Sequence, residues 1–316
     1  MSWRRRLRPL DRARYVLAKH GAALRSRRGV VAVGVGPRLR KGQWRAAEIC
    51  LQVFVERKPR PESSVPVRMR IPKSLDGVPI DVIESRFRAG AGCSIAGPDP
   101  IRRTRNGVLV GGIALARTTS NTYGTLGALL EDANSVYALT AGHVVEADAA
   151  NVGQPFYASD WIGNVAALRR STAANLDAAL VRIEPTSGRF VASGMFNGPA
   201  QSLGVGSIWS STGPVHVHGA CSGHVLADVR SVPWSGTIHY QDGSNITLHD
   251  QAMVVPRNGS ITEGDSGGAV LDSSQRRLLG MIVGGDTHAG LAIVTPIDSI
   301  LGTAAFQPGG ARLTPI

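Results

Sequence analysis

Gly264-Asp265-Ser266-Gly267-Gly268-Ala269 is the stretch of sequence that decides the fold of this chain of 316 residues. A serine between glycines fits a tight turn, because glycine adopts backbone conformations that other residues avoid. In such a turn, backbone N–H groups converge beside the hydroxyl, where they can stabilise a negatively charged oxygen. Ser266 is therefore the candidate nucleophile, and its own N–H and that of Gly264 are the candidate oxyanion donors.

A histidine upstream, in Thr140-Ala141-Gly142-His143-Val144-Val145, is the candidate base. A neutral serine hydroxyl is a poor nucleophile and needs a base within hydrogen-bond reach. A histidine beside two valines can also be a core residue satisfied by its neighbours. The small residues before His143, and its position ahead of Ser266 in the chain, favour the catalytic interpretation.

The carboxylate that orients the base is expected in Asn175-Leu176-Asp177-Ala178-Ala179-Leu180-Val181. An aspartate at the head of an apolar strand is desolvated unless it binds a partner, and an imidazole N–H is a natural one. Asp148 and Asp160 are rivals, but both lie in polar, loop-like surroundings. Asp177 is therefore predicted to orient His143.

The composition favours strands and turns over long helices, because aromatic residues make up only 5% of the chain while Gly numbers 38 and Pro 18. From residue 107 onward, short apolar segments recur at a spacing of about 8–12 residues, which is typical of all-β folds. Their number suits two six-stranded antiparallel β-barrels, followed by a terminal helix over 297–306. The predicted fold class is therefore mainly β.

Residues 1–90 are predicted to form a small α+β module ahead of a second domain over 91–316. A helix over 12–27 precedes strands over 30–35, 49–55 and 80–83, and a Pro-rich connector spans 59–66. The helix is expected to use Tyr15, Val16, Ala18, Ala22 and Leu24 as its apolar side. A stretch rich in Gly, Pro and Arg over 90–105 marks the domain boundary.

Positive charge is concentrated in the N-terminal module. Residues 1–90 carry 22 Lys and Arg against 7 Asp and Glu, a net charge of +15, whereas the remainder carries 13 against 16. Such an excess can attract a polyanion. Because the arginines are scattered, apart from Arg4 to Arg6 and Arg25 to Arg28, no nucleic-acid partner is expected. A protein partner that regulates the chain through residues 1–90 remains open.

The cysteines Cys50, Cys93 and Cys221 are odd in number and far apart, so no disulfide framework is expected. No apolar segment of about 7–15 residues follows the N-terminal arginines, and no run of about 18 apolar residues exists. A cytoplasmic protein without a membrane span is therefore expected.

A metal site could be suggested by His216, His218, Cys221 and His224, since His and Cys are zinc ligands. However, residues 215–226 are typical of a hairpin that turns at 220–223, and no further ligand framework accompanies them. We therefore expect neither a metal ion nor a cofactor.

His143 in Thr-Ala-Gly-His, Asp177 in Leu-Asp-Ala-Ala-Leu and Ser266 in Gly-Asp-Ser-Gly-Gly occur in the order of the trypsin-like (chymotrypsin-fold) serine proteases, which this chain resembles. The resemblance covers roughly residues 91–305. It consists of the three motifs and their order, which match the Ser-His-Asp triad of that superfamily. It implies two β-barrels with the site between them. It also implies a serine endopeptidase that acts on proteins or peptides through an acyl-enzyme intermediate.

A weaker resemblance covers more of the chain. The segments Val33-Gly34-Val35-Gly36, Ile71-Pro72, Gly77-Val78-Pro79-Ile80-Asp81-Val82, Gly92-Cys93-Ser94-Ile95 and Gly124-Thr125-Leu126-Gly127-Ala128 are similar to the plant narrow-leaf-type proteases and their bacterial relatives. Those proteins place a small α/β module before the trypsin-like domain. The resemblance therefore implies the same order of domains here.

The family also raises the question of activation. In secreted trypsins a new N-terminus, freed by cleavage, pairs with the aspartate before the serine, which is Asp265 here. Val108-Leu109-Val110-Gly111-Gly112 resembles such a terminus faintly, but many bacterial members of the fold order the oxyanion hole without one. We therefore do not expect activation by cleavage at this segment.

The resemblance implies a substrate pocket with Ser260 near its base and Gly284 and Gly285 on its wall. Because no acidic residue occupies that base, an uncharged pocket is expected. Two other functions stay open. An esterase would use the same residues, and a catalytically silent binding or scaffold protein would keep the fold and contact a polyanion through residues 1–90.

Overall fold

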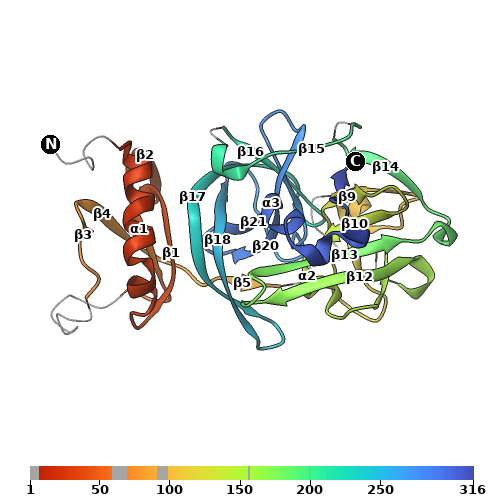
Figure 1. Ribbon diagram of the computed structural model, residues 1–316, viewed down its shortest axis with the longest axis horizontal. Coiled ribbons are helices and arrows are strands. Elements are labelled where there is room, and N and C mark those ends of the chain that lie inside the picture. The colour runs from red at the N-terminus through yellow and green to blue at the C-terminus, as the bar shows by residue number, and fades with distance from the viewer. Residues whose placement is uncertain (1–6, 59–69, 91–98, 156, 199, 212) are drawn as a thin grey trace.

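The computed structural model describes residues 7–58, 70–90, 99–155, 157–198, 200–211 and 213–316 (Figure 1). Strands hold 49% of the described residues and helices 15%, so the chain is mainly β, as the sequence predicts. The Pro-rich segment predicted over 59–66 lies outside the described residues.

The N-terminal residues form one helix against a small sheet. Helix α1 (Pro9–Arg25) has a proline in its first turn, where the missing N–H costs no helical hydrogen bond. Strands β1 (Val30–Arg40), β2 (Gln43–Val55), β3 (Ser74–Leu75) and β4 (Val78–Glu84) follow. The buried side of α1 repeats every three or four residues and consists of Ala13, Val16, Leu17, Gly21 and Leu24.

The expected apolar side of this helix is therefore partly wrong. Tyr15, Ala18 and Ala22 are exposed, and only Val16 and Leu24 of the predicted set face the sheet. The buried side of α1 is set by the strands that it contacts, which are β1, β2 and β4.

The small sheet continues into the main one without a break. Strand β1 pairs with β17 (Gly223–Tyr240), so that Ala32 lies opposite Gly236 and Gly34 opposite Trp234. The fully buried side chain of Gln52 adds to this joint, since its Nε2 donates to the carbonyl of Arg230 at 3.0 Å. Backbone hydrogen bonds therefore attach the N-terminal residues to the rest of the molecule.

The joined sheet has twelve strands. Its path runs β16-β19-β20-β21-β18-β17-β1-β2-β4-β3, and β5 and β15 pair at its side. The strands introduced here are β16 (Val215–Gly219), β19 (Ala269–Leu271), β20 (Arg277–Asp286), β21 (Leu291–Pro296), β18 (Asn245–Pro256), β5 (Arg88–Ala89) and β15 (Gly204–Val205).

The second sheet has eight strands, in the order β22-β9-β10-β13-β12-β11-β7-β8. They are β22 (Thr314–Pro315), β9 (Ala128–Glu131), β10 (Val136–Thr140), β13 (Leu176–Ile183), β12 (Trp161–Ser171), β11 (Asn151–Gly153), β7 (Ile113–Arg117) and β8 (Gly124–Leu126). Strands β6 (Val108–Gly111) and β14 (Phe190–Met195) pair separately and in parallel.

These strand counts differ from two sets of six. The larger sheet gains strands from the N-terminal residues through the β1–β17 pairing, which no local sequence pattern reveals. The predicted terminal helix is also shorter, because α3 (Ile297–Leu301) stops before Gly302 and a separate 3-10 turn covers Ala304–Phe306.

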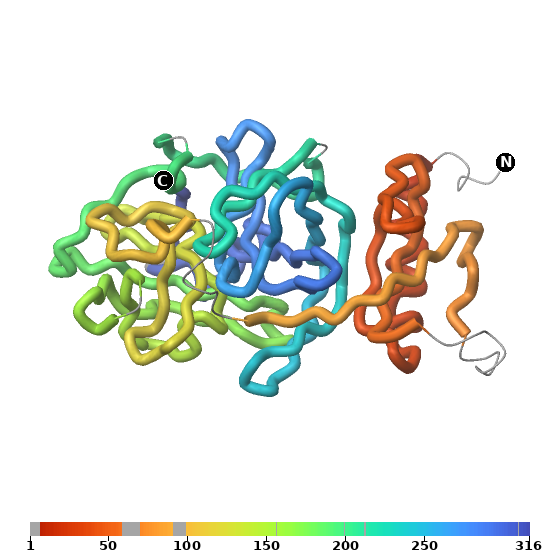
Figure 2. The backbone as a smooth tube through the Cα atoms, turned by 180° about the vertical axis from the view of Figure 1, so that it is seen from behind, coloured from red at the N-terminus to blue at the C-terminus, as the bar shows by residue number. Residues whose placement is uncertain are grey.

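Three buried aromatic rings connect the N-terminal sheet to the main body. Phe87, which is fully buried, packs edge-on against Phe54 at 5.4 Å between ring centroids and against Trp234 at 4.8 Å. Such pairs prefer this T-shaped arrangement. Phe87 therefore fixes the start of the segment that leads from β4 into the main body, which Figure 2 shows as an extended orange tube.

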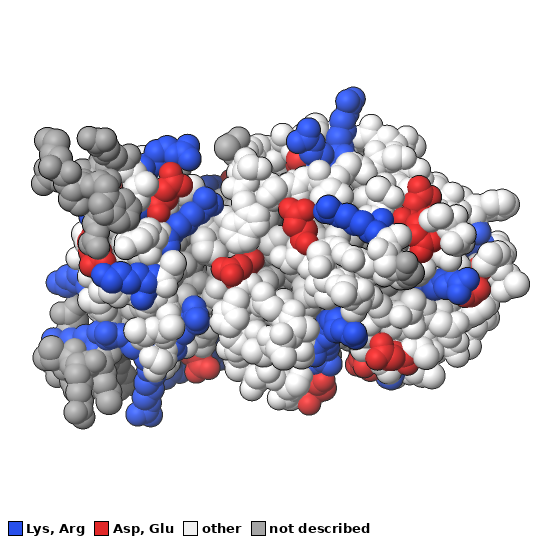
Figure 3. Space-filling model, in the orientation of Figure 1, with Lys and Arg blue, Asp and Glu red and all other residues white. Residues whose placement is uncertain are grey.

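The surface charge agrees with the scattered arginines in the sequence. Figure 3 shows the molecule in the orientation of Figure 1, with Lys and Arg spread over its N-terminal end and acidic side chains between them. Some of these charges are paired, as in the contact of Lys19 Nζ with Asp76 Oδ2 at 2.9 Å.

Replacing Leu24 by Ala tests the packing of α1. Leu24 is 2% exposed, and truncating a buried leucine costs about 2–5 kcal/mol. We expect the free energy of unfolding, measured by urea titration, to fall by this amount. Ile101→Ala is the control, because Ile101 is 57% exposed and its loss should cost less than about 0.5 kcal/mol. Equal effects of the two changes would contradict the packing described here.

Candidate active site

The loop between β18 and β19 carries Ser266 and is held from two sides. The backbone N–H of Thr125 donates to the Ser266 carbonyl at 2.8 Å, and the Thr125 hydroxyl donates to the Gly264 carbonyl at 2.9 Å. On the other side, the N–H of Gly267 donates to Ile282 of β20 at 2.8 Å. The loop therefore spans the two sheets, and its position depends on both.

The tight turn expected around Ser266 is present. Gly264 and Gly267 have φ values of +90° and +93°, which favour glycine. A Cβ on Gly267 would lie 2.3 Å from the Thr125 carbonyl oxygen and 2.5 Å from the Thr140 hydroxyl. Glycine at this position lets the serine turn pack directly against the strand that leads to His143.

Asp265 is fully buried and its carboxylate is satisfied by nearby residues. Its Oδ1 accepts from the N–H groups of Cys221 and Ser222, each at 2.9 Å. Its Oδ2 accepts from the Ser222 hydroxyl at 2.5 Å and from the Thr262 N–H at 2.9 Å. Burial raises the pKa of Asp265, and these hydrogen bonds oppose the rise. The donors occupy the carboxylate that a new N-terminus binds in secreted trypsins.

The cysteines correct one expectation from the sequence. Cys221 is disulfide-bonded, whereas buried Cys50 is free. The prediction of a chain without disulfides is therefore wrong, because wide spacing in the sequence does not prevent two cysteines from meeting in a fold rich in non-local strand pairs. Burial raises the pKa of the Cys50 thiol to about 12, so it stays protonated.

His143 and Asp177 meet as the sequence suggests. His143 lies in α2 (Gly142–Val145), directly after β10, and Asp177 lies on the neighbouring strand β13. Nδ1 of His143 is 2.6 Å from Oδ2 of Asp177, and the His143 N–H donates to Oδ1 at 2.9 Å. The carboxylate therefore fixes the ring and favours the tautomer with a proton on Nδ1.

Tyr240, at the end of β17, is a part of this group that the sequence analysis missed. Its hydroxyl donates to Oδ2 of Asp177 at 2.9 Å, and its ring lies edge-on to that of His143 at 5.4 Å. Burial, together with the charge of Asp177, raises the pKa of Tyr240, so it remains a neutral donor. No motif surrounds this tyrosine, and only the β17 pairing brings it to the site.

The two other aspartates considered from the sequence lie elsewhere. Asp148 is exposed. Asp160 is 3.2 Å from Nε of Arg105 and 3.6 Å from a guanidinium nitrogen of Arg189, so it forms a structural ion-pair group. Neither is bonded to His143 among the described contacts.

Ser266 and His143 are both buried, and no hydrogen bond joins them in the part of the chain that the structure describes. The Ser266 hydroxyl donates to the carbonyl of Gly90 at 3.3 Å. Nε2 of His143 is buried and has no hydrogen-bond partner among the described residues.

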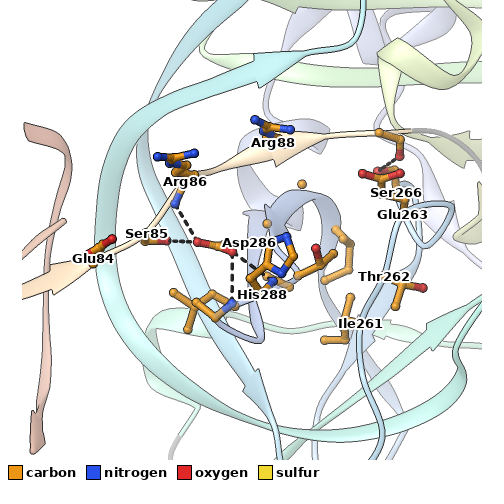
Figure 4. Close-up of a pocket in the computed structure, with 18 of the residues that line it drawn as sticks. Glu84, Ser85, Arg86, Arg88, Ile261, Thr262, Glu263, Ser266, Asp286 and His288 are labelled. Carbon is orange, nitrogen blue, oxygen red and sulfur yellow. Dashed lines mark hydrogen bonds between the residues drawn. The ribbon is translucent and has the colours of Figure 1, made fainter. Parts of the chain in front are cut away.

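A cavity of about 520 Å³ opens beside Ser266 (Figure 4). Gly284 and Gly285 line it, whereas Ser260 is exposed and is not among its lining residues, so the cavity contains two of the three residues expected at the substrate pocket. The lining mixes apolar groups with charges of both signs, where an uncharged pocket was expected. The charged residues are Glu56, Glu84, Arg86, Arg88, Glu263 and Asp286.

The histidines of the β16–β17 hairpin contact one another. Nδ1 of His216 is 2.7 Å from Nε2 of His224, and Nε2 of His218 is 3.1 Å from the Gln275 side-chain oxygen. Burial lowers the pKa of His218 to about 3, so this ring is neutral at pH 7. Among the described residues, no group of His, Cys, Asp and Glu has the arrangement of a metal site.

Comparison with solved structures shows the fold. Protease A of Thermobifida fusca is 22% identical with a TM-score of 0.50, and the match covers 66% of this chain and 98% of that protein. A glutamic acid-specific serine protease, described as using a histidine triad in substrate binding, is also 22% identical with a TM-score of 0.50. That match covers 66% of this chain and all of the other. Both are chymotrypsin-fold serine proteases.

No protein-family model and no curated protein matches the chain. The resemblance to the plant narrow-leaf-type proteases therefore stays a prediction. In the described part of the chain, none of the helices has the length and apolar character needed to cross a membrane.

Replacing Tyr240 by Phe tests the contact with Asp177. The change removes a hydrogen bond to a buried charged group, which contributes about 1.5–3 kcal/mol. We expect the free energy of unfolding at pH 7 to fall by about this amount in urea titrations. Tyr137→Phe is the control for the loss of a tyrosine hydroxyl. The Tyr137 hydroxyl also donates to an aspartate, at 3.1 Å, but that aspartate, Asp132, is more accessible to water than Asp177. A Tyr240→Phe protein as stable as the wild type would show that the contact contributes nothing.

Proposed function

We propose that the chain is a serine endopeptidase in which Ser266 is the nucleophile, His143 the general base and Asp177 the orienting carboxylate. The N–H groups of Gly264 and Ser266 would stabilise the oxyanion. The proposal includes a protease domain over 91–316, built as two barrels, and an N-terminal module over 1–90. The substrate would be a protein or peptide.

The observation that carries the proposal is the buried contact of His143 Nδ1 with Asp177 Oδ2 at 2.6 Å, which leaves Nε2 without a partner among the described residues. A histidine held in this way is ready to act as a base at its other nitrogen. The glycine-flanked Ser266 lies in the same region, since a Cβ on neighbouring Gly267 would be 3.1 Å from the N atom of Ala141.

The proposed mechanism follows from these positions. Nε2 of His143 takes the Ser266 proton as Oγ attacks the substrate carbonyl, and it later gives the proton to the leaving amine. Asp177 stabilises the imidazolium that forms between these steps. Water then hydrolyses the acyl-enzyme by the same route.

The site has a direct chemical test, which is labelling by a fluorophosphonate probe. We expect the wild-type protein to be labelled and Ser266→Ala to remain unlabelled, because the probe reacts only with an activated serine. Ser210→Ala is the control, since Ser210 is exposed and bonds only to the carbonyl of Ser207 among the described residues.

A wild-type protein that resists the probe would contradict the proposal and favour a catalytically silent scaffold. Labelling with hydrolysis of esters but not of any peptide in a mixed library would favour an esterase. Labelling together with new peptide ends, detected by mass spectrometry, would support an endopeptidase.

Replacing Asp177 by Asn separates orientation from nucleophilicity. The amide would present an N–H or a weaker acceptor to Nδ1 of His143, which disfavours the tautomer needed for catalysis. In trypsin the equivalent change lowers kcat by about 10⁴, and we expect a loss of the same order here. Peptide turnover is the measurement. A loss below about tenfold would show that another group orients His143.

A further inference from the structure

The segment that links the N-terminal module to the main body lies in the candidate active site. This connector, residues 85–90, follows β4 and ends at the carbonyl that contacts Ser266. Figure 2 shows it crossing as an extended tube, and Figure 4 shows it above the cavity beside Ser266.

Two contacts hold the first half of the connector. Oδ2 of Asp286 accepts from the Ser85 hydroxyl at 2.8 Å and from the Arg86 N–H at 2.6 Å. Its other oxygen accepts from the N–H groups of His288 and Ala289, each at 3.1 Å, so the carboxylate itself is fixed. Phe87 follows and is fully buried.

The second half of the connector pairs as an added strand. Arg88 lies antiparallel to Gly285 of β20, and Ala89 lies parallel to Tyr240 of β17. Extended peptides commonly bind proteins by adding a strand to a sheet in this way. A Cβ on Gly284 would lie 2.7 Å from the Arg88 carbonyl oxygen, so glycine in β20 provides the space that the connector fills.

Gly90 directly follows this strand, and its carbonyl lies at the proposed catalytic groups. The oxygen accepts from the Gly264 N–H at 3.4 Å and from the Ser266 hydroxyl at 3.3 Å. The first of these is a proposed oxyanion donor. The carbonyl of a residue about to be cleaved has to contact the same donor.

The position of Gly90 also restricts which residue fits. A Cβ there would lie 2.9 Å from the Glu263 carboxyl carbon and 3.1 Å from the Gln241 side-chain nitrogen. The connector therefore presents the residue that this crowded position accepts without movement of its neighbours. Strand pairing, the oxyanion contact and the fit of Gly90 describe an occupant held as a substrate is held.

We propose that the chain is a substrate of its own active site and is cleaved at the peptide bond that follows Gly90. This inference rests on the proposed serine peptidase function. Ser266 Oγ forms a bond to the Gly90 carbonyl carbon, the C–N bond to the next residue breaks, and the serine proton passes through His143 to the new amine. Water then hydrolyses the ester to leave a Gly90 carboxylate, with no other reactant.

The N-terminal fragment stays bound after cleavage, because the pairing of β1 with β17 does not involve the broken bond. The two fragments should therefore elute together on a native column and separate only under denaturing conditions. Cleavage therefore has to be measured under denaturing conditions.

The test follows the full-length protein over time by denaturing electrophoresis and intact mass. We expect two fragments, residues 1–90 and 91–316, whose masses sum to that of the chain plus one water. Ser266→Ala should stay intact, and so should wild-type protein treated with a fluorophosphonate as it is purified. A first-order rate that does not change with protein concentration would show that each chain cuts itself.

Gly90→Val tests the geometry, because it adds carbon atoms where Glu263 and Gln241 already crowd the position. We expect cleavage to slow by roughly 10²-fold, the cost of a misplacement of about 1 Å. Gly107→Val is the matched control, since nothing lies within 4 Å of a Cβ there. Equal rates for both variants would contradict the assignment of Gly90.

The remaining outcomes separate this inference from the function on which it rests. A wild-type chain that is labelled and hydrolyses added peptides but stays intact would leave the peptidase standing and overturn self-cleavage. Faster peptide hydrolysis by intact Gly90→Val would then identify the connector as an inhibitor. Cleavage of Ser266→Ala at the wild-type rate would assign the cut to another protease. A wild-type chain and a Gly90→Val chain that are both uncut, unlabelled and inactive on added peptides would overturn both proposals.

Discussion

The buried carboxylate of Asp177 is the point on which the arrangement of the site depends. It lies on β13 of the eight-stranded sheet, yet it accepts a hydrogen bond from Tyr240 on β17 of the twelve-stranded sheet. An unpaired carboxylate at this depth would be strongly destabilising, and here its donors come from both sides, from His143 after β10 and from Tyr240 of β17. The requirement to satisfy one charge thus fixes His143 and aligns the two sheets.

The loop that carries Ser266 also depends on the alignment of the two sheets. Thr125 of the smaller sheet and Ile282 of the larger one both bond to it, so a shift of either sheet would move Ser266 relative to His143. Asp265 is a second buried carboxylate in the site, and its hydrogen-bond donors are Cys221, Ser222 and Thr262. Buried charges with complete sets of partners give the site its rigidity.

The sequence pointed to the candidate residues of the site better than to the residues around them. Ser266, His143 and Asp177 stand in short motifs, and the contact between His143 and Asp177 could be anticipated from them. Tyr240, Asp286 and Gly90 have no such motif, and they reach the site only through the long-range pairings of β17, β20 and β5. The exposed residues of α1 were misassigned for a related reason, since the face a helix buries depends on which strands cover it.

The attachment of the N-terminal residues explains why the connector reaches the site at all. Pairing of β1 with β17 sets where β4 ends, and the packing of Phe87 against Trp234 sets the direction of the chain beyond it. Only Arg88 and Ala89 then separate this anchor from Gly90. A segment tethered this closely meets Ser266 without the loss of translational freedom that a free peptide incurs, which is worth several kcal/mol in favourable cases. The same backbone pairing that joins the N-terminal residues to the larger sheet therefore places the Gly90 carbonyl at the Ser266 hydroxyl.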